Sequence, residues 1–457
     1  MNPARGRVLA PPRGKTLGVA AIAMAPPSQT GRVMALLLLL PMFAQCFQYM
    51  TDIPPLYLLS KIWPFVTLPV AIWAGLSLRM PYKALHAGNL FWLLAVTPAM
   101  GILNLGNTFP DAMATTVKVW SFTYVFSAAG LMVLLRVQAE SLTRVLIGMG
   151  AGTYILMALL WVAVPTSAYG GGDLDTKLFM TDVERGYRIY MPMFFGMLLI
   201  FYLNRSMLSR FATWKFVAMG IAFILLLTIY KQRTAIAGAG FAVAVGACLA
   251  QRRWRAAAFS ALALLGAIGV AAIFVRAQMS SELKEGLGNS LAVREVSVAQ
   301  AWNYVSAEPL RWLFGVGGTT RLGDVTLGKL FNNPMFFLTD IGWLGVLFEY
   351  GTVGVILMVS VHLAGLKLAL TWAHPDDPMS QALADYIVYL IATSFVYSVV
   401  FTPGELMTVM AISFVLARAR AGYGIAASQP AIPSPRHRAP ARSLALGPGP
   451  SGIASNG

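Results

Sequence analysis

Long apolar runs alternate with short polar segments along most of the chain, from Val33 to Ala419. A helix needs about 20 apolar residues to cross the hydrocarbon core, and lipid cannot satisfy unpaired backbone groups, so runs of this length predict membrane-spanning helices. The pattern indicates an all-α, polytopic integral membrane protein. It predicts about twelve spans, at residues 33–50, 56–78, 89–106, 116–135, 145–165, 189–204, 213–230, 234–250, 256–275, 350–372, 381–400 and 403–420.

Two predicted connections are much longer than the others. Residues 166–188 lie between the fifth and sixth spans, and residues 276–349 lie between the ninth and tenth. The chain ends, residues 1–32 and 421–457, are rich in small residues and proline, which predicts disordered tails around one transmembrane domain, residues 33–420. Chemistry that lipid cannot host is expected on the two long connections.

The composition agrees with a membrane protein, because 57% of the residues are hydrophobic and only 11% are charged, against about 25% in a soluble domain. The net charge of +16 follows the positive-inside rule. With the N-terminus in the cytoplasm, 21 of the 34 basic residues fall on the cytoplasmic side and 14 of the 18 acidic residues fall outside. The charge therefore indicates topology rather than nucleic-acid binding, with cytoplasmic termini and outward-facing long connections.

Ionisable residues in the predicted spans bear on the choice between a transporter and an enzyme. An ion-coupled transporter places such residues near the bilayer midplane, often in two related halves. Lys61, Lys118, Asp385 and Glu405 instead lie close to span ends, where we interpret them as snorkelling side chains. His362 lies well inside a span and is interpreted as a hydrogen-bonded packing residue. A transporter is kept as the alternative to an enzyme.

Basic and aromatic residues occur together in three clusters on the predicted outer side. Guanidinium groups hold phosphate oxygens through paired hydrogen bonds, and aromatic faces pack on sugar rings or lipid headgroups. This combination suits a lipid-linked diphosphate sugar, whereas a headgroup contact is the simpler interpretation of any one arginine. The clusters are Arg185 and Arg188 with Tyr187 and Tyr190, Lys231 and Arg233 after Tyr230, and Arg294 with Trp302 and Tyr304.

Three stretches together resemble the O-antigen ligase and polymerase superfamily of bacterial envelope glycosyltransferases. Residues 230–238 (YKQRTAIAG) resemble the Arg-Thr segment that opens a span in that family. Residues 294–318 (REVSVAQAWNYVSAEPLRWLFGVGG) resemble its outer-loop helix, which ends in a Gly-x-Gly turn, and residues 340–354 (DIGWLGVLFEYGTVG) resemble its closing motif. Twelve spans with the large loop between the ninth and tenth also match. The resemblance covers residues 185–360 in motif and the whole chain in topology.

The resemblance implies a glycosyltransferase in the bacterial inner membrane whose active site faces the periplasm. Its substrate would be an oligosaccharide linked to undecaprenyl diphosphate, because the periplasm lacks nucleotide sugars and the lipid diphosphate must supply the energy. The implied partners are this substrate, membrane lipid, and a flippase and chain-length regulator of the same pathway. No cofactor is implied.

The chain departs from the family's ligases at one position. Those ligases have a histidine nine residues before the closing-motif glutamate, and here that position holds Asp340, nine residues before Glu349. The four histidines, His86, His362, His374 and His437, all lie outside the two long outer connections. The departure favours a polysaccharide polymerase, which joins repeats into an extracellular or surface polysaccharide, over an O-antigen ligase, which remains an alternative.

Transfer from a lipid-diphosphate donor needs cations that hold the diphosphate as charge builds on it, and a carboxylate that takes the acceptor proton. Arg188 and Arg233 are predicted for the first role, with Arg294 as a third cation. Asp340 is predicted as the base, and its alternative role is the N-cap of a helix starting near Gly342.

Further residues receive supporting roles. Tyr190, Lys231, Trp302 and Tyr304 are predicted to bind substrate, and Glu349 is predicted to cap or orient the turn at Gly351. Residues 315–318 (GVGG) are predicted to form a turn.

A metal ion is not expected. Asp173 and Asp175 form an Asp-x-Asp pair in a glycine-rich stretch that favours a solvated loop, and arginines already provide countercharge. Cys46 and Cys248 lie in apolar runs, so neither a disulfide framework nor a Cys-rich metal site is expected.

Overall fold

The computed structural model describes residues 28–48, 50–171, 178–182, 185–250, 289–318, 326–334, 336–372, 377–397 and 402–428, with a few isolated positions between them. Most of the predicted ninth span, residues 256–275, lies outside the described residues, as do Asp173, Asp175 and nearly all of both predicted tails.

Helices dominate the described residues. The α-helices are α1 Gln29–Phe43, α2 Pro54–Val66, α3 Leu68–Ser77, α4 Lys83–Phe91, α5 Thr97–Leu105, α6 Phe109–Thr115, α7 Tyr124–Leu134, α8 Ala139–Ala163, α9 Phe194–Ser209, α10 Thr213–Leu225, α11 Arg233–Ala250, α13 Asn289–Ser306, α14 Pro309–Phe314, α15 Leu327–Leu330, α16 Trp343–Trp372, α17 Pro378–Thr393 and α18 Pro403–Ser428. Two π-helical turns, η1 Trp92–Val96 and η5 Leu226–Tyr230, and four 3-10 turns, η2 Thr116–Lys118, η3 Trp120–Thr123, η4 Thr166–Ala168 and η8 Leu338–Ile341, connect them.

Six helical stretches in the described residues are long and apolar enough to cross a membrane, so this is a helical membrane protein. They are Pro54–Ser77, Lys83–Leu105, Ala139–Ala163, Thr213–Tyr230, Arg233–Ala250 and Trp343–Trp372. The pair Phe109–Lys118 and Trp120–Leu134, bent by 51°, gives a seventh if it is one span. The total of twelve stays a prediction.

Helix ends differ from the predicted ends where an amphipathic segment continues an apolar one. α16 begins at Trp343, seven residues before the predicted start of its span, and α18 continues to Ser428, eight residues beyond its predicted end. Hydropathy detects only the part of a helix that faces lipid or core, and therefore misses such extensions.

A small sheet interrupts the otherwise helical fold within the predicted connection 166–188. β1 Gly170–Gly171 pairs in parallel with β2 Phe179–Asp182, which pairs antiparallel with β3 Gly186–Ile189. The pairing places Met180 opposite Arg188. The all-α prediction therefore needs this one addition.

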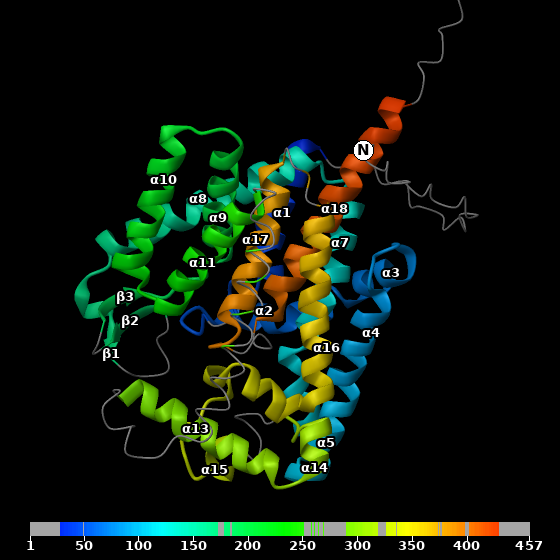
Figure 1. Cartoon of the computed structure of the whole chain (residues 1–457), viewed down its shortest axis with the longest axis vertical. Helices are drawn as coiled ribbons and strands as arrows, with labels where there is room; N and C mark the ends of the chain where they lie inside the picture. Colours follow the sequence, from blue (N-terminus) through cyan, green and yellow to red (C-terminus); the bar gives the residue numbers. More distant parts are fainter. Residues whose placement is uncertain are drawn as a thin grey trace, which may run out of the picture.

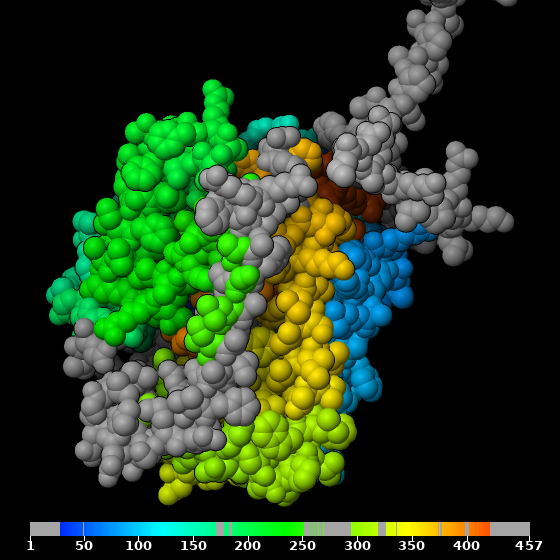
Figure 2. Space-filling model, in the orientation of Figure 1, coloured from blue at the N-terminus to red at the C-terminus, as the bar shows by residue number. Residues whose placement is uncertain are grey.

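The two predicted outer segments lie at the same end of the helix bundle. Figure 1 shows the sheet and the helices α13 to α15 toward the lower end, and the end of α18 toward the upper end. In Figure 2 the helices α13 to α15 (yellow-green) lie directly below the lower part of α16 (yellow) and against it. The arrangement agrees with the predicted separation of the long connections from the termini; the side of the membrane that each end faces stays a prediction from the charge distribution.

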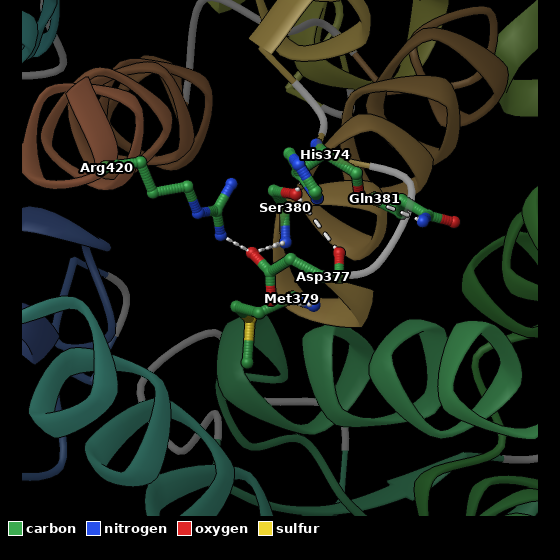
Figure 3. Close-up of polar contacts among 6 residues, drawn as sticks. All are labelled: His374, Asp377, Met379, Ser380, Gln381 and Arg420. Carbon is green, nitrogen blue, oxygen red and sulfur yellow. Dashed lines mark hydrogen bonds and ion pairs between the residues drawn. The ribbon is translucent and has the colours of Figure 1, made fainter. Parts of the chain in front are cut away.

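Contacts at the opposite end connect α17 to α18. Asp377 accepts hydrogen bonds from the backbone N–H groups of Met379 (3.2 Å) and Ser380 (3.1 Å), and so caps α17. Arg420 of α18 forms an ion pair with the same carboxylate (Figure 3). The connection between α16 and α17 and the last turns of α18 therefore lie together, as the predicted topology requires.

A labelling experiment tests which end faces outward. Glu308 precedes α14 at the lower end of the bundle in Figure 1, whereas Arg144 lies near the start of α8, beside the start of α1 at the upper end, where Arg32 donates to the Arg136 carbonyl. The Glu308 and Arg144 side chains are 53% and 71% exposed. We expect a membrane-impermeant thiol reagent to label Glu308→Cys on intact spheroplasts, and Arg144→Cys only after permeabilisation. The unmodified chain is the control for its two native cysteines, and the reverse pattern would contradict the predicted orientation.

Candidate functional site

A second hydrophobic core, separate from that of the main bundle, holds the outer helices together. The rings of Trp302 and Trp312 meet edge to face with centroids 5.2 Å apart. The Arg311 guanidinium lies 4.3 Å from the centroid of the Tyr304 ring, and that ring also contacts Phe348 of α16. Trp302 and Tyr304 thus help to pack this cluster. Their predicted part in substrate binding is untested, and the packing contacts give both a structural role.

The helix α16 breaks at Gly351, and the Gly-rich turn enters the break. Gly351 has φ 68° and ψ −177°, so nearby carbonyl groups lose their intrahelical donors. The N–H of Val316 donates to the Phe348 carbonyl (2.7 Å), and the N–H of Gly317 donates to the Glu349 carbonyl (3.2 Å). The predicted turn at residues 315–318 is confirmed, since Gly315 and Gly317 both have positive φ.

Glycine is required on both sides of this contact because the two backbones touch. A Cβ at Gly315 would lie 2.4 Å from the Glu349 carbonyl oxygen, and one at Gly351 would lie 2.4 Å from the Gly315 nitrogen. The turn also rests on α5, since a Cβ at Gly317 would lie 2.3 Å from the Gly101 nitrogen. Two of the three stretches that carry the family resemblance therefore pack directly against each other.

An ion pair closes the same junction. Nζ of Lys118 lies 2.6 Å from both carboxylate oxygens of Glu349, whose side chain is 3% exposed. The snorkelling interpretation of Lys118 is therefore wrong. The Glu349 side chain pairs with Lys118 instead of capping the Gly351 turn, although the backbone carbonyl of Glu349 does accept from the turn at 315–318. This pair fixes the lower half of α16 against η2.

Asp340 lies in the 3-10 turn η8, which precedes α16. Gly342 separates that turn from the first residue of α16, and the Asp340 carboxylate accepts a hydrogen bond from the Thr339 hydroxyl (3.3 Å). Among the described residues no backbone N–H of α16 donates to it, so the N-cap alternative is wrong. The half-buried carboxylate of Asp340 stays available for other chemistry.

Arg188 lies on β3 and is only 8% exposed. Its Nη2 lies 3.6 Å from Sδ of Met180 on the neighbouring strand. Two residues after Arg188, the ring of Tyr190 stacks on that of Tyr230, with ring centroids 6.0 Å apart and an interplanar angle of 4°. The sheet, which hydropathy did not predict, therefore positions Arg188 near Tyr230, at the connection between α10 and α11.

Tyr190 connects the residues that the sequence placed in separate segments. It interacts electrostatically with Arg188 and Asp340, and also with Tyr397 and Glu405. Arg188 and Asp340 thus both lie within electrostatic range of Tyr190, and we call the group of residues around Tyr190 the Tyr190 site.

The other predicted cations are placed differently. Nζ of Lys231 donates to the carbonyl groups of Arg185 and Tyr187, each at 2.9 Å, so Lys231 tethers β3 to the start of α11. Arg233 is exposed in the first turn of α11, and the neighbouring Gln232 accepts a hydrogen bond from Tyr397 (3.3 Å), which belongs to the Tyr190 site.

Arg294 lies on α13, half-buried, and no contact within the described residues joins it to the Tyr190 site. Its predicted role as a third cation therefore gains no support.

Glu405 and its tyrosine neighbours complete the site and were not predicted. Oε2 of Glu405 accepts a hydrogen bond from the Tyr386 hydroxyl (2.8 Å), so the snorkelling interpretation of Glu405 is wrong. Glu405 also interacts electrostatically with Tyr230 and Tyr389. The one signal in the sequence is a carboxylate in a predicted span, near tyrosines spaced three and eight residues apart in the preceding predicted span, 381–400.

Asp385 and His362, two further ionisable residues in predicted spans, have structural partners. Nε and Nη2 of Arg205 each lie 2.6 Å from a carboxylate oxygen of Asp385, and their side chains are 4% and 0% exposed. Arg205 lies one residue beyond the predicted span 189–204 and is nevertheless buried, and the snorkelling interpretation of Asp385 is wrong. Nδ1 of His362 donates to the Met358 carbonyl (2.7 Å), which confirms its prediction as a hydrogen-bonded packing residue.

Metal ligands do not gather in the part of the chain that the structure describes. No three His, Cys, Asp or Glu side chains lie close enough there to hold a metal ion. The Asp173 and Asp175 pair lies outside the described residues.

Comparisons with known proteins give little further information. No protein-family model matches the chain, and no curated protein matches it. A solved chain from a structure described as "Structural coordination of polymerization and crosslinking by a peptidoglycan synthase complex" aligns with a TM-score of 0.34 and 17% identity, over 74% of this chain and 98% of that chain. A likeness this weak supports no argument about activity.

Proposed function

We propose that this protein polymerises oligosaccharide repeats, linked to undecaprenyl diphosphate, at the periplasmic face of a bacterial inner membrane. The observation that supports the proposal is the Tyr190 site: Arg188, buried on β3 two residues before Tyr190, and the half-buried Asp340 both act electrostatically on Tyr190, at the end of the bundle that carries both long connections. A buried guanidinium and a half-buried carboxylate in one site supply the two groups that transfer from a lipid diphosphate requires.

In the proposed reaction, Arg188 and the exposed Arg233 hold the diphosphate of the donor. Asp340 accepts the proton of an acceptor hydroxyl while the hydroxyl oxygen forms a bond to the anomeric carbon of the donor glycan. The bond between that carbon and the diphosphate oxygen breaks, and the electron pair leaves with undecaprenyl diphosphate. The reaction needs no leaving-group acid, because the diphosphate is a stable anion when arginines neutralise its developing charge.

A gene deletion tests the class of activity. We expect the deletion strain to accumulate single repeats on the lipid carrier at the periplasmic face, and wild-type protein to restore polymer. Asp340→Asn should fail to restore polymer at a normal protein level, because the amide cannot take a proton, whereas Asp340→Glu should restore part of it.

The other outcomes identify the alternatives. Repeats that accumulate on the cytoplasmic face would indicate a flippase, and long lipid-linked polymer that fails to reach lipid A core would indicate a ligase. Normal polymer from Asp340→Asn would remove Asp340 from the mechanism without affecting the class of activity.

A further inference from the structure

Among the described residues, Asp385 and Glu405 lie inside predicted spans and Glu349 directly precedes one; all three are buried or half-buried, and two of them have a cationic partner. Glu349 pairs with Lys118, and Asp385 pairs with Arg205, each at 2.6 Å. Within the described residues, Glu405 forms no ion pair, and its hydrogen-bond partner is the Tyr386 hydroxyl. A carboxylate in a membrane protein is costly unless it is paired, and those kept without a cation usually serve a function.

The surroundings of Glu405 point to a neutral ligand with several hydroxyl groups. Oε2 accepts from Tyr386, while Oε1 has no hydrogen bond among the described residues. Glu405 also interacts with Tyr190, Tyr230 and Tyr389, and the half-buried side chain stays partly open. Sugar hydroxyls donate to carboxylates, and the apolar faces of sugar rings pack on aromatic rings.

Charge then separates two halves of the site. A diphosphate is repelled by a carboxylate and attracted by a guanidinium, so the donor diphosphate belongs on the Arg188 side. Tyr190 adjoins both halves: Arg188 precedes it by two residues, and the ring of Tyr386, which holds Glu405, packs at 4.9 Å on Phe194, four residues after Tyr190. The acceptor sugar is uncharged, and it therefore fits the half of the site that contains Glu405.

We infer that Glu405, held by Tyr386, binds the acceptor repeat by accepting a hydrogen bond from one of its sugar hydroxyls. This inference rests on the proposed function. It gives the two carboxylates different roles, because Asp340 takes the proton of the reacting hydroxyl and Glu405 holds a hydroxyl that does not react. Tyr386 is a positioning residue, which orients the carboxylate through its 2.8 Å hydrogen bond.

The test uses the full-length purified protein and lipid-linked single repeats isolated from the deletion strain. We expect Glu405→Gln to raise the KM for the repeats about tenfold, because the neutral amide oxygen accepts a sugar hydroxyl more weakly than a carboxylate does. Inhibition by added undecaprenyl diphosphate should be unchanged, since that product occupies only the donor half. Glu308→Gln, an exposed outer-loop change, is the matched control and should alter neither value.

A second variant protects the test against misfolding. Tyr386→Phe keeps the ring in the core but removes the hydroxyl, and should raise the KM a few-fold with the thermal midpoint nearly unchanged. A purely structural role for Glu405 would lower the midpoint and the yield of folded protein, and would leave the KM of the folded fraction unchanged. That result would overturn the inference.

The remaining outcomes are distinct. If undecaprenyl diphosphate inhibits Glu405→Gln more weakly than wild type, Glu405 acts on the donor and the inference is wrong. If wild-type protein makes no polymer from the repeats, the proposed function itself fails. Polymer from wild type together with an unchanged KM in Glu405→Gln would reject only the role of Glu405.

Discussion

Arg188→Lys is expected to lower polymer synthesis a hundredfold to a thousandfold although it keeps the positive charge. A guanidinium presents a planar fork of donors that matches two phosphate oxygens, whereas an ammonium is a compact, strongly hydrated charge. Loss of one preorganised donor to developing negative charge typically costs about 3 to 4 kcal/mol in the transition state. Arg188 is only 8% exposed, so water cannot easily replace the lost hydrogen bonds.

The measurement is the initial rate of polymer formation per folded protein from purified lipid-linked repeats. Undecaprenyl diphosphate should also inhibit Arg188→Lys more weakly than wild type, because Arg188 is proposed to bind the diphosphate of the donor and of this product alike. Arg144→Lys is the control, since the Arg144 side chain is 71% exposed and lies at the opposite end of the bundle. Equal rates for the two lysine variants would reject Arg188 as a diphosphate ligand and leave it as a strand residue that packs on Met180.

Asp385→Ala is expected to destabilise the fold by about 3 to 5 kcal/mol, because it leaves the Arg205 guanidinium buried without its anion. Both Arg205–Asp385 contacts measure 2.6 Å, and the pair joins α9 to α17. Gly246 of α11 packs on it so closely that a Cβ there would lie 2.6 Å from Oδ2 of Asp385. The pair is therefore central to a three-helix contact.

The thermal midpoint of the purified protein in detergent measures this effect. Glu140→Gln provides the comparison, because the exposed Glu140–Arg144 pair (3.3 Å) should contribute at most about 0.5 kcal/mol. The double replacement of Arg205 and Asp385 by leucine should recover much of the lost stability, since two matched apolar side chains remove the unpaired charge. A midpoint for Asp385→Ala within a degree of wild type would show that the buried pair does not stabilise the fold.

The family resemblance concerned order and spacing of short motifs, and the structure shows what two of them do. Residues 315–318 and Gly351 form one backbone contact in which each part supplies what the other lacks, N–H donors on one side and free carbonyl groups on the other. Nothing in either segment alone predicts this contact. The glycines could be predicted as turn residues, yet the need for glycine comes from the other segment.

Local sequence determined which parts of the chain are helical and where most helices lie. Apolar runs and polar breaks depend on neighbouring residues only, so the helices at 139–163, 213–230, 233–250 and 343–372 could be located to within several residues. The same reasoning identified the two long outer segments, and charge counting indicated which end of the bundle they share. It missed the small sheet, because its strands have four residues or fewer and are too short for an alternating hydrophobic pattern to be recognised.

Tertiary structure alone decided the partners of the charged residues. Lys118 and Glu349 are 231 positions apart, and Arg205 and Asp385 are 180 apart, so no local pattern connects them. All four residues lie near the end or the start of a predicted span. Hydropathy measures how polar a position is, and does not show which helix packs against it. Glu405 differs from Glu349 and Asp385 because it has tyrosine neighbours where those two carboxylates have a cation. This difference arises only when α17, α18 and the segment around Tyr190 pack together.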